Sequence, residues 1–355
     1  MIYVFERDLS DRKSVSSAQS IDWTEKYNEI GFFSIIVGAT DRNAEILKNG
    51  KIIYYEGFVG IIQQVICETT TITINGKSLA ELLNQRIILN EVTISTVESS
   101  LYSAWTKNMR GIDVESSAAK GLTETYNTVL WGLQFGEAVQ TMCKEADLGF
   151  RVVLDLENSK KLFEVYKGED KSEIDNPKGV VFSTSKNTLS GIQIDNDDSS
   201  LKNVAYVFAA DENEKRIVEV VGDVTGANRR ELIVDQSGMM PEAEHDIIDE
   251  NGNKIGTQPA ETMEEFRQRL RTMGLDALRD YTSRLNFTAT VPTSEYGTKY
   301  NLGDRVRCYS KKYNLQLTVR ITEMRRVVDT TGSQLQLTLG EPKISMKEMV
   351  RIWQT

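Results

Sequence analysis

KIIYYEGFVGIIQQVIC at residues 51–67, followed after a gap of three residues by TITIN at 71–75, is dominated by β-branched and aromatic side chains. Such segments favour β-strands, and the short gap predicts a hairpin. Gly57 and Gly60 inside the longer segment predict bulges or tight bends, which a small barrel requires. With a short opening strand at residues 2–5, the pattern predicts a first β-barrel domain over residues 1–90.

Helical patterns begin at the end of this region. Ser78 is a good N-cap and Glu81 stands at capping-box distance from it, so a short helix should follow the hairpin. Apolar residues then recur every four positions over 97–110 and before Gly149, which predicts two further helices. Strands are expected at 150–156 and 161–167. We interpret residues 91–185 as an inserted α/β module.

The second half of the chain returns to strand patterns. The strands are expected at 191–195, 201–210, 215–221, 229–234, 285–291, 304–310, 315–328 and 333–339. An acidic arm at 235–265 and a long helix at 262–283, started by a Thr262–Glu265 capping box, interrupt them. These patterns predict a second β-barrel domain over 186–342 and a C-terminal helix at 343–355. The expected fold class is α+β and β-rich, with two small antiparallel β-barrel domains and inserted helical and mixed modules.

Charge and hydropathy narrow the possible partners. The 355 residues carry 42 basic and 52 acidic side chains, a formal net charge of −10. Residues 235–265 alone hold nine acidic residues against one lysine. A sequence-independent nucleic-acid binder needs a basic stripe, and none is visible, so no specific nucleic-acid binding is expected. No apolar run approaches the roughly 20 residues that cross a bilayer, so no membrane anchor is expected.

Patterns that carry chemistry are weak throughout the chain. With one histidine, His245, an HExxH metal site is impossible, and the dispersed Cys67, Cys143 and Cys308 indicate buried thiols in a reducing compartment. The string DENGNKIG at 249–256 begins like a calcium loop but lacks its glycine and final glutamate, so we interpret it as a turn, with a weak calcium site as the alternative. No Walker loop, dinucleotide fingerprint or nucleophile elbow occurs. We expect no catalytic, cofactor-binding or metal-binding residues and no cofactor.

Five segments together resemble a known family. They are MIYVFERDL (1–9), SIDWTEKYNEIGFFSIIV (20–37), YEGFVGIIQQV (55–65), TITINGKSLAELLNQRII (71–88) and YNLGDRVRCYSKKYNLQLTVRITEMRRVVDTTGSQLQLTLGEP (300–342). Their order and spacing resemble the Gp37-like tail proteins of long-tailed bacteriophages and prophages. That family is similar to the N-terminal, structural part of baseplate hub and tail-associated proteins. The resemblance covers the two ends of the chain and little of 91–285.

The residues that carry this resemblance have structural roles. We expect them to place aromatic pairs, tight turns and the strand-to-helix junction of the barrels. They are Trp23, Tyr27, Asn28, Gly31, Gly57, Gly76, Ser78, Leu79, Leu302, Gly303 and Asp304. The resemblance assigns none of them a catalytic role.

The resemblance implies a non-enzymatic baseplate hub at the tail tip of a phage or phage-tail-like particle. Three chains would form a homotrimer that joins the sixfold tail tube to a trimeric tip, in contact with the distal tail or tube protein, the tape measure and a tip or spike protein. The chain would lie in the virion tail, and in the host cytoplasm before assembly. Some relatives carry a wall-cleaving domain beyond the hub. This chain stops at Thr355, so we expect any such activity in a separate chain. Two alternatives stay open: a peptidoglycan-degrading tail enzyme with its site in 91–185, and a carbohydrate- or ligand-binding β-module.

Overall fold

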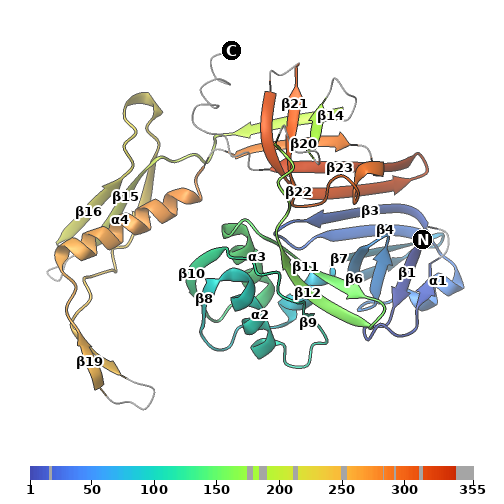
Figure 1. The fold of residues 1–355 in the computed structure, drawn as a ribbon, viewed down its shortest axis with the longest axis horizontal. Helices are drawn as coiled ribbons and strands as arrows, with labels where there is room; N and C mark the ends of the chain where they lie inside the picture. The colour runs from blue at the N-terminus through green and yellow to red at the C-terminus, as the bar shows by residue number, and fades with distance from the viewer. Residues whose placement is uncertain are drawn as a thin grey trace. The chain divides into compact units, whose positions relative to one another are not determined.

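The computed structural model describes residues 1–15, 18–173, 179–183, 190–210, 215–248, 254–282, 284–291, 293–311 and 315–340. The chain forms two compact units (Figure 1). Unit 1 comprises residues 1–194 and 286–355, and unit 2 comprises residues 195–285. The predicted domain boundaries at residues 90, 185 and 342 stay a prediction.

One large sheet dominates unit 1 and contains both ends of the described chain. Its strands are β1 (Ile2–Phe5), β2 (Lys13–Ser14), β3 (Ala18–Lys26), β4 (Phe32–Gly38), β5 (Ile52–Tyr55), β6 (Phe58–Cys67), β7 (Thr71–Ser78), β13 (Val181–Ser183), β14 (Ser190–Asp197), β20 (Arg284–Val291), β21 (Arg305–Ser310), β22 (Leu315–Asp329) and β23 (Gly332–Gly340). The order is β14-β20-β23-β22-β3-β4-β7-β6-β5-β1-β2, with β21 paired to β22 and β13 to β21.

The N-terminal and C-terminal strands meet where β3 pairs antiparallel with β22, and Trp23 lies opposite Arg326. Figure 1 shows these two strands side by side in blue and red. The β-rich α+β class is confirmed. Because the described strands form one continuous path of pairings in which no closed barrel is evident, the two-barrel arrangement stays a prediction.

The predicted strand at 51–67 is two strands. Strand β5 ends at Tyr55 and β6 begins at Phe58, so Glu56 and Gly57 form a two-residue hairpin turn. Both turn residues have positive φ, 48° and 93°, as this turn type requires. The prediction of a bulge or bend within a strand at Gly57 was therefore wrong. The sequence EG gave a weaker turn signal than Asn-Gly or Asp-Gly would have given.

The helix after β7 was predicted at the right place with the wrong cap. Residues Leu79–Gln85 form a 3-10 helix, η1, but Ser78 does not cap it through its side chain. The Ser78 hydroxyl instead accepts a hydrogen bond from the Gly31 backbone N–H at 3.2 Å, and Glu81 binds Lys77. A tertiary contact has replaced the local capping box.

Residues 92–166 form the inserted α/β region. Its elements are β8 (Val92–Thr96), α2 (Val97–Asn108), β9 (Glu115–Ser116), β10 (Thr125–Leu130), α3 (Phe135–Glu145), β11 (Gly149–Asp155) and β12 (Lys160–Tyr166), while the short α1 (Asp41–Ile46) lies between β4 and β5. The rings of Trp105, Phe135 and Phe163 pack together with centroids 4.8–6.4 Å apart. This cluster is continuous with buried residues of the large sheet, such as Val59 and Ile61, so the region shares one core with it.

Unit 2 is a small sheet covered on one face by a long helix. The sheet order is β16 (Arg216–Val221), β15 (Val204–Ala210), β17 (Glu231–Asp235), and α4 (Met263–Arg279) packs on it through the fully buried Phe266 and Leu270. The Thr262–Glu265 capping box is confirmed. The helix ends at Arg279 rather than at residue 283.

Part of the acidic segment 235–265 pairs as a hairpin, which corrects the prediction of an extended arm. Its strands are β18 (His245–Ile248) and β19 (Lys254–Gln258), with His245 opposite Gln258. The turn of the calcium-like string, residues 249–253, lies outside the described residues, as does the predicted C-terminal helix 343–355. Two single 3-10 turns complete the elements, η3 (Gly226–Asn228) and η4 (Thr293–Glu295).

Candidate functional site

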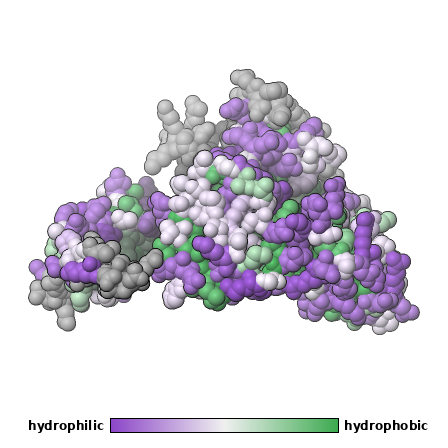
Figure 2. All heavy atoms as spheres, turned by 60° about the horizontal axis from the view of Figure 1, so that its bottom comes forward, coloured by the Kyte–Doolittle hydropathy of each residue, from purple (hydrophilic) through white to green (hydrophobic). Residues whose placement is uncertain are grey.

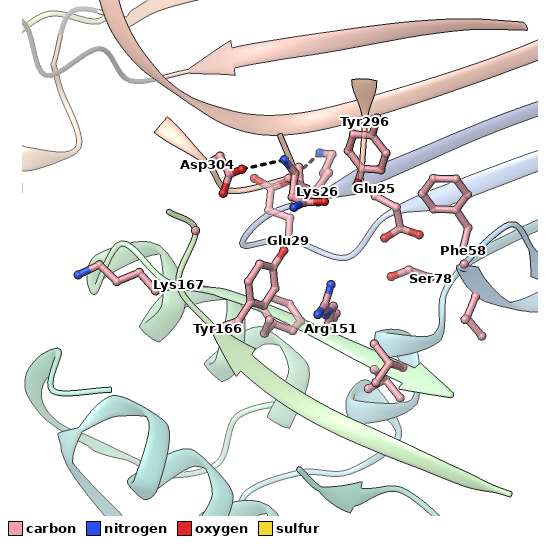
Figure 3. A pocket seen from close by; sticks show the side chains of 18 of the residues that line it. Glu25, Lys26, Glu29, Phe58, Ser78, Arg151, Tyr166, Lys167, Tyr296 and Asp304 are labelled. Carbon is pink, nitrogen blue, oxygen red and sulfur yellow. Dashed lines mark hydrogen bonds and ion pairs between the residues drawn. The ribbon is translucent and has the colours of Figure 1, made fainter. Parts of the chain in front are cut away.

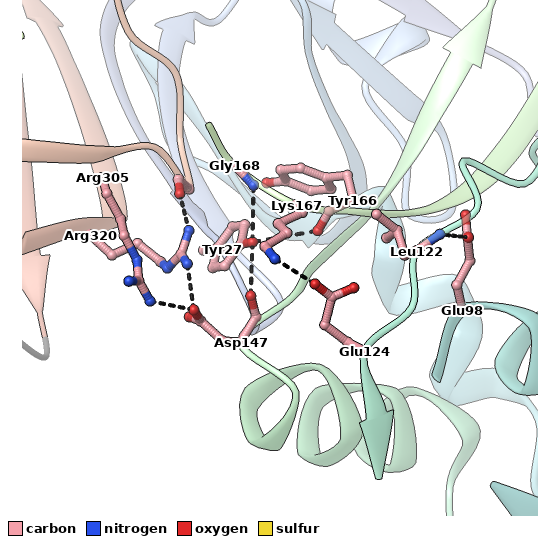
Figure 4. A network of polar contacts seen from close by, with 11 residues as sticks. Tyr27, Glu98, Leu122, Glu124, Asp147, Tyr166, Lys167, Gly168, Arg305 and Arg320 are labelled. Atoms are coloured by element: carbon pink, nitrogen blue, oxygen red, sulfur yellow. Dashed lines mark hydrogen bonds and ion pairs between the residues drawn. The ribbon is translucent and has the colours of Figure 1, made fainter. Parts of the chain in front are cut away.

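Three distant segments of unit 1 meet around the ring of Tyr27, which is fully buried. The Tyr27 hydroxyl donates to the carbonyl oxygens of Asp147 and Tyr166 (3.3 and 3.4 Å) and accepts from the Gly168 backbone N–H at 3.2 Å (Figure 4). Burial raises the pKa of Tyr27 to about 12, so the phenol keeps its proton. The first, middle and last parts of the chain are therefore joined through one side chain.

Two glycines allow this ring to sit so deep. A Cβ atom on Gly303 would lie 2.3 Å from the Tyr27 ring, and one on Gly149 would lie equally close. Gly303 also has φ +93°, a conformation that other residues resist. Gly303 was expected from the sequence to make a tight turn, and its second role is to make room for Tyr27.

The Asp147 carboxylate and two arginines form ion pairs beside the Tyr27 ring. Asp147 Oδ2 accepts hydrogen bonds from Arg320 (2.5 Å) and Arg305 (2.6 Å), as Figure 4 shows. Arg320 also donates to the Gly303 carbonyl oxygen and lies with its guanidinium 4.9 Å from the Tyr27 ring centroid. Burial alone would raise the pKa of Asp147, but the hydrogen bonds and charges of the two arginines hold that pKa below its usual value.

Asp304 forms a second polar centre beside the first. Its carboxylate is buried and accepts from the backbone N–H groups of Glu169 (2.9 Å) and Asn301 (2.8 Å). It also accepts from Lys171 Nζ at 2.7 Å, and the lysine is buried too. One carboxylate thus fixes two loops and neutralises a buried cation. We call the residues Tyr27, Asp147, Gly303, Asp304 and Arg320 the Tyr27 junction.

Other residues that carry the family resemblance form a separate cluster in the N-terminal strands of the large sheet. Trp23 stacks on Phe33 with ring centroids 4.5 Å apart, and Gly76 leaves no room for a Cβ because the Phe33 ring would lie 2.5 Å away. Gly31 and Ser78 are hydrogen-bonded to each other. Of the remaining motif residues, Leu79 is buried, Asn28 is half-buried in a bend, Gly57 makes the β5–β6 turn and Leu302 lines a pocket.

Sequence reasoning placed Tyr27, Gly303 and Asp304 in different structural roles and did not bring them together. It missed Asp147, Arg305, Arg320 and Lys171 entirely, because each lies more than 120 residues from its principal partner. The one signal available was the aspartate after the predicted helix that precedes Gly149. That signal is too common to be used alone.

A pocket of about 440 Å³ opens next to the junction. Figure 3 shows the Glu25 carboxyl group within it, between the Tyr296 ring on one side and Ser78 and Arg151 on the other. Burial raises the pKa of Glu25 to about 7, although the hydrogen bond from Trp23 and the charge of Arg151 act in the opposite direction. Among the side chains of the described residues, no group of three or more His, Cys, Asp or Glu is arranged to hold a metal ion.

With this geometry in place, comparison with known proteins identifies the family. The family model described as Siphovirus ReqiPepy6 Gp37-like protein matches residues 1–341. The chain belongs to this family. The predicted resemblance is thereby confirmed, and it extends over the middle of the chain, where the sequence had shown little. No curated protein sequence matches the chain.

Solved structures of tail proteins share the fold of this Gp37-like protein. The tail protein from Neisseria meningitidis MC58 is 13% identical with a TM-score of 0.57, and the match covers 96% of each chain. The prophage tail protein gp18 from Listeria monocytogenes EGD-e is 15% identical with a TM-score of 0.53, covering 100% of this chain and 99% of that one. The 43 kDa tail protein of prophage MuSo2 from Shewanella oneidensis is 13% identical with a TM-score of 0.56, covering 95% and 97%.

The Gp37-like chain also carries an apolar strip on its surface. Five large apolar side chains are exposed on the segments that flank Ile88 and Gly132, which are hydrogen-bonded to each other. We call them the Trp131 strip: Ile87, Leu89, Val129, Trp131 and Leu133. Trp131 is 66% exposed, and its indole N–H donates to the Leu89 carbonyl oxygen.

Two arginines border this strip, and neither has an acidic partner in the part of the chain that the structure describes. Arg86 and Arg110 donate to backbone carbonyl oxygens, and Arg110 binds that of Ile87. Figure 2 shows that on the face it presents, apolar side chains reach the surface in small groups among hydrophilic ones. A row of five such residues with a tryptophan is therefore a distinct feature, and tryptophan and arginine are the residue types that dominate protein interfaces.

Two of the three thiols of this Gp37-like chain are buried. Cys143 and Cys308 are buried, and burial raises the pKa of both, to about 12 for Cys308. Cys67 is exposed at the end of β6, so the prediction of burial was wrong for this residue. Among the described residues, no helix is both long enough and apolar enough to cross a membrane.

Proposed function

We propose that the chain is a structural baseplate hub protein at the tail tip of a phage or phage-tail-like particle. The observation that carries this proposal is membership of the Gp37-like family over residues 1–341. Its support is a fold shared over nearly the whole chain with tail proteins from three bacteria. The chain would be made in the host cytoplasm and assembled into the virion tail.

The hub would be a homotrimer. The two β-rich parts of each chain would alternate around the ring. Three chains would then offer six similar faces to a sixfold tail tube and three similar faces to a trimeric tip. A head-to-tail interface of this kind closes into a ring when the rotation completes the circle. The other contacts would be with the distal tail or tube protein, the tape measure and a tip or spike protein.

The Trp131 strip supports assembly with other proteins. Exposed apolar groups rimmed by charged residues are typical of interaction sites rather than of free surfaces. Because the arginines on its border have no acidic partners among the described residues, the surface that covers it should present acidic side chains beside apolar ones.

Assembly with the strip as a contact can be tested on purified particles. Trp131→Ala should reduce incorporation of the chain into tails, measured by immunoblotting of gradient-purified particles, while the soluble amount of the chain stays unchanged. Leu156→Ala is a matched control, because Leu156 is an exposed apolar residue in a different part of the same unit. Equal loss in both variants, or no loss in either, would contradict a role for the strip.

We also propose that the chain is not an enzyme. The peptidoglycan-degrading alternative requires two carboxylates around a sugar bond, one with a raised pKa. Glu25 supplies the raised pKa, but among the described contacts its carboxylate is bonded to an indole and not to a second acid. Incubation of the purified chain with peptidoglycan separates the two functions, because release of soluble muropeptides would contradict the structural one.

A further inference from the structure

The pocket beside the Tyr27 junction has the size of a small-molecule site and is lined by aromatic rings and charged groups. Its volume of about 440 Å³ lies in the range of ligand-binding pockets in proteins. Glu25 at the end of β3, Phe58 after the β5–β6 turn, Arg151 on β11, Tyr166 at the end of β12 and Tyr296 line it. All five belong to unit 1, so the pocket is built by one compact unit.

The basic side chains of the pocket are already neutralised. Arg151 Nε lies 2.5 Å from a Glu164 oxygen, and Lys167 Nζ lies 2.5 Å from Glu124. Lys26 Nζ lies 2.6 Å from Glu29, which also lines the pocket. An anionic ligand such as a phosphate would find no unpaired cation among these groups.

Glu25 is a polar group of the pocket that keeps free hydrogen-bonding capacity. One carboxyl oxygen accepts a hydrogen bond from the Trp23 indole N–H at 2.7 Å, and the other has no partner among the described residues. Because burial raises the pKa of Glu25 to about 7, the carboxyl group is partly protonated near neutral pH. The carboxyl group can therefore donate a hydrogen bond to a ligand hydroxyl group or accept one from it.

Aromatic rings line the pocket around Glu25 and offer apolar faces to a ligand. The Tyr296 ring lies directly beside the Glu25 carboxyl group, with the Phe58 ring on the other side of it (Figure 3). Tyr166 is buried and its ring is held by the Arg151 guanidinium 4.7 Å from the centroid. Tyrosine combines a large apolar ring with a polar tip, so it can cover the C–H face of a sugar while its hydroxyl binds the edge.

We propose that this pocket binds a neutral sugar ring, with the ring stacked against Tyr296 and its hydroxyl groups bound by Glu25. The inference goes beyond the hub function and does not depend on it. A neutral polyhydroxylated ligand fits the pocket because its polar groups pair with a carboxyl that carries a proton part of the time. A fixed anion would meet the acids of the pocket and find no unpaired cation, whereas a neutral sugar needs only hydrogen-bond partners and a ring to pack against.

The test is a titration of the full chain at neutral pH. Neutral pyranoses (glucose, galactose, rhamnose and N-acetylglucosamine) would be compared with methylammonium and inorganic phosphate by saturation-transfer NMR and calorimetry. We expect at least one pyranose to bind in the millimolar range. Glu25→Ala should weaken that binding about tenfold, as loss of one hydrogen bond to a ligand does, whereas Glu25→Gln, whose amide both donates and accepts, should weaken it less.

Two variants make the result specific. Tyr296→Phe keeps the ring and removes its hydroxyl, so it should weaken binding less than Tyr296→Ala. Glu45→Gln is the matched control, because Glu45 is an exposed acid on α1 and should leave binding unchanged. Circular dichroism of each variant checks that the fold is intact.

Several results would overturn the proposal. They are binding of methylammonium or phosphate in preference to every pyranose, absence of pyranose binding at tens of millimolar, and pyranose binding that Glu25→Ala and Tyr296→Ala leave intact. None of these results bears on the incorporation of the chain into tails. The hub function and the sugar site can therefore be contradicted independently of each other.

Discussion

Replacement of Asp304 by alanine should strongly destabilise unit 1. The carboxylate holds the buried Lys171 Nζ at 2.7 Å and accepts two backbone N–H groups, from Glu169 and Asn301. Removing one member of a buried ion pair costs about 3–5 kcal/mol, because the other charge stays buried. Lys171 would keep only the exposed Glu169 carboxylate, at 3.5 Å, and the Lys299 carbonyl oxygen as partners. For a unit of this size, at about 2–4 °C per kcal/mol, that corresponds to a fall of about 6–20 °C in Tm.

Differential scanning calorimetry and urea unfolding of the purified chain would measure the loss. Asp329→Ala is the matched control, because Asp329 also accepts a backbone N–H, from Thr331, but lies in the exposed β22–β23 turn. The double variant Asp304→Ala with Lys171→Met should lose less than the sum of the two single losses, because no charge is then left unpaired. The reasoning would be refuted if Asp304→Ala lowered the free energy of unfolding no more than Asp329→Ala does. It would also be refuted if the double variant lost as much free energy of unfolding as the two single variants together.

Three further predictions concern other parts of the molecule. Gly303→Ala should destabilise unit 1 by about 2–5 kcal/mol in urea unfolding, because the new Cβ meets the Tyr27 ring and φ is +93°. Gly50→Ala is the control: at φ +84° with no atom within 4 Å, it should lower the free energy of unfolding only by the smaller cost of backbone strain. Because the pKa of Glu25 is raised to about 7 in the folded chain, its contribution to stability is complete below the unfolded pKa and is lost as pH rises through 7; Glu25→Gln should therefore flatten the dependence of the urea midpoint on pH between about 5 and 8. Gly274→Ala should loosen α4 from the unit 2 sheet, because its Cβ would lie 2.7–2.8 Å from two valines, and faster hydrogen exchange in α4 than in unit 1 would show it.

Most strands and helices could be predicted from the sequence because their signals are local. The β22 and β23 segments alternate apolar and polar side chains, and the structure places them within one or two residues of the expected positions. The Thr262–Glu265 capping box is a four-residue pattern, and its side chains have no competing partner. Ser78 and Glu81 have the same spacing, but a hydrogen bond to Gly31, 47 residues away, removes the serine from the cap.

The site could not be predicted, because its contacts are between distant segments. Tyr27 and Gly303 were each expected to be structural, but only the fold shows that one makes room for the other. Asp147 and Arg320 are separated by 173 residues, and the family segment that contains Arg320 gives no sign of this partner. The pairing of β3 with β22 brings both ends of the chain into one sheet, and no local sequence pattern predicts such a pairing.

The central claim is that three copies of this chain form a ring at the tail tip. Counting copies per particle tests it most directly, by quantitative mass spectrometry of purified tails against a tube protein of known copy number, or by the symmetry of a tail-tip density map. The account predicts three copies in a single layer. Six copies in one layer, or a single copy, would contradict the ring of three.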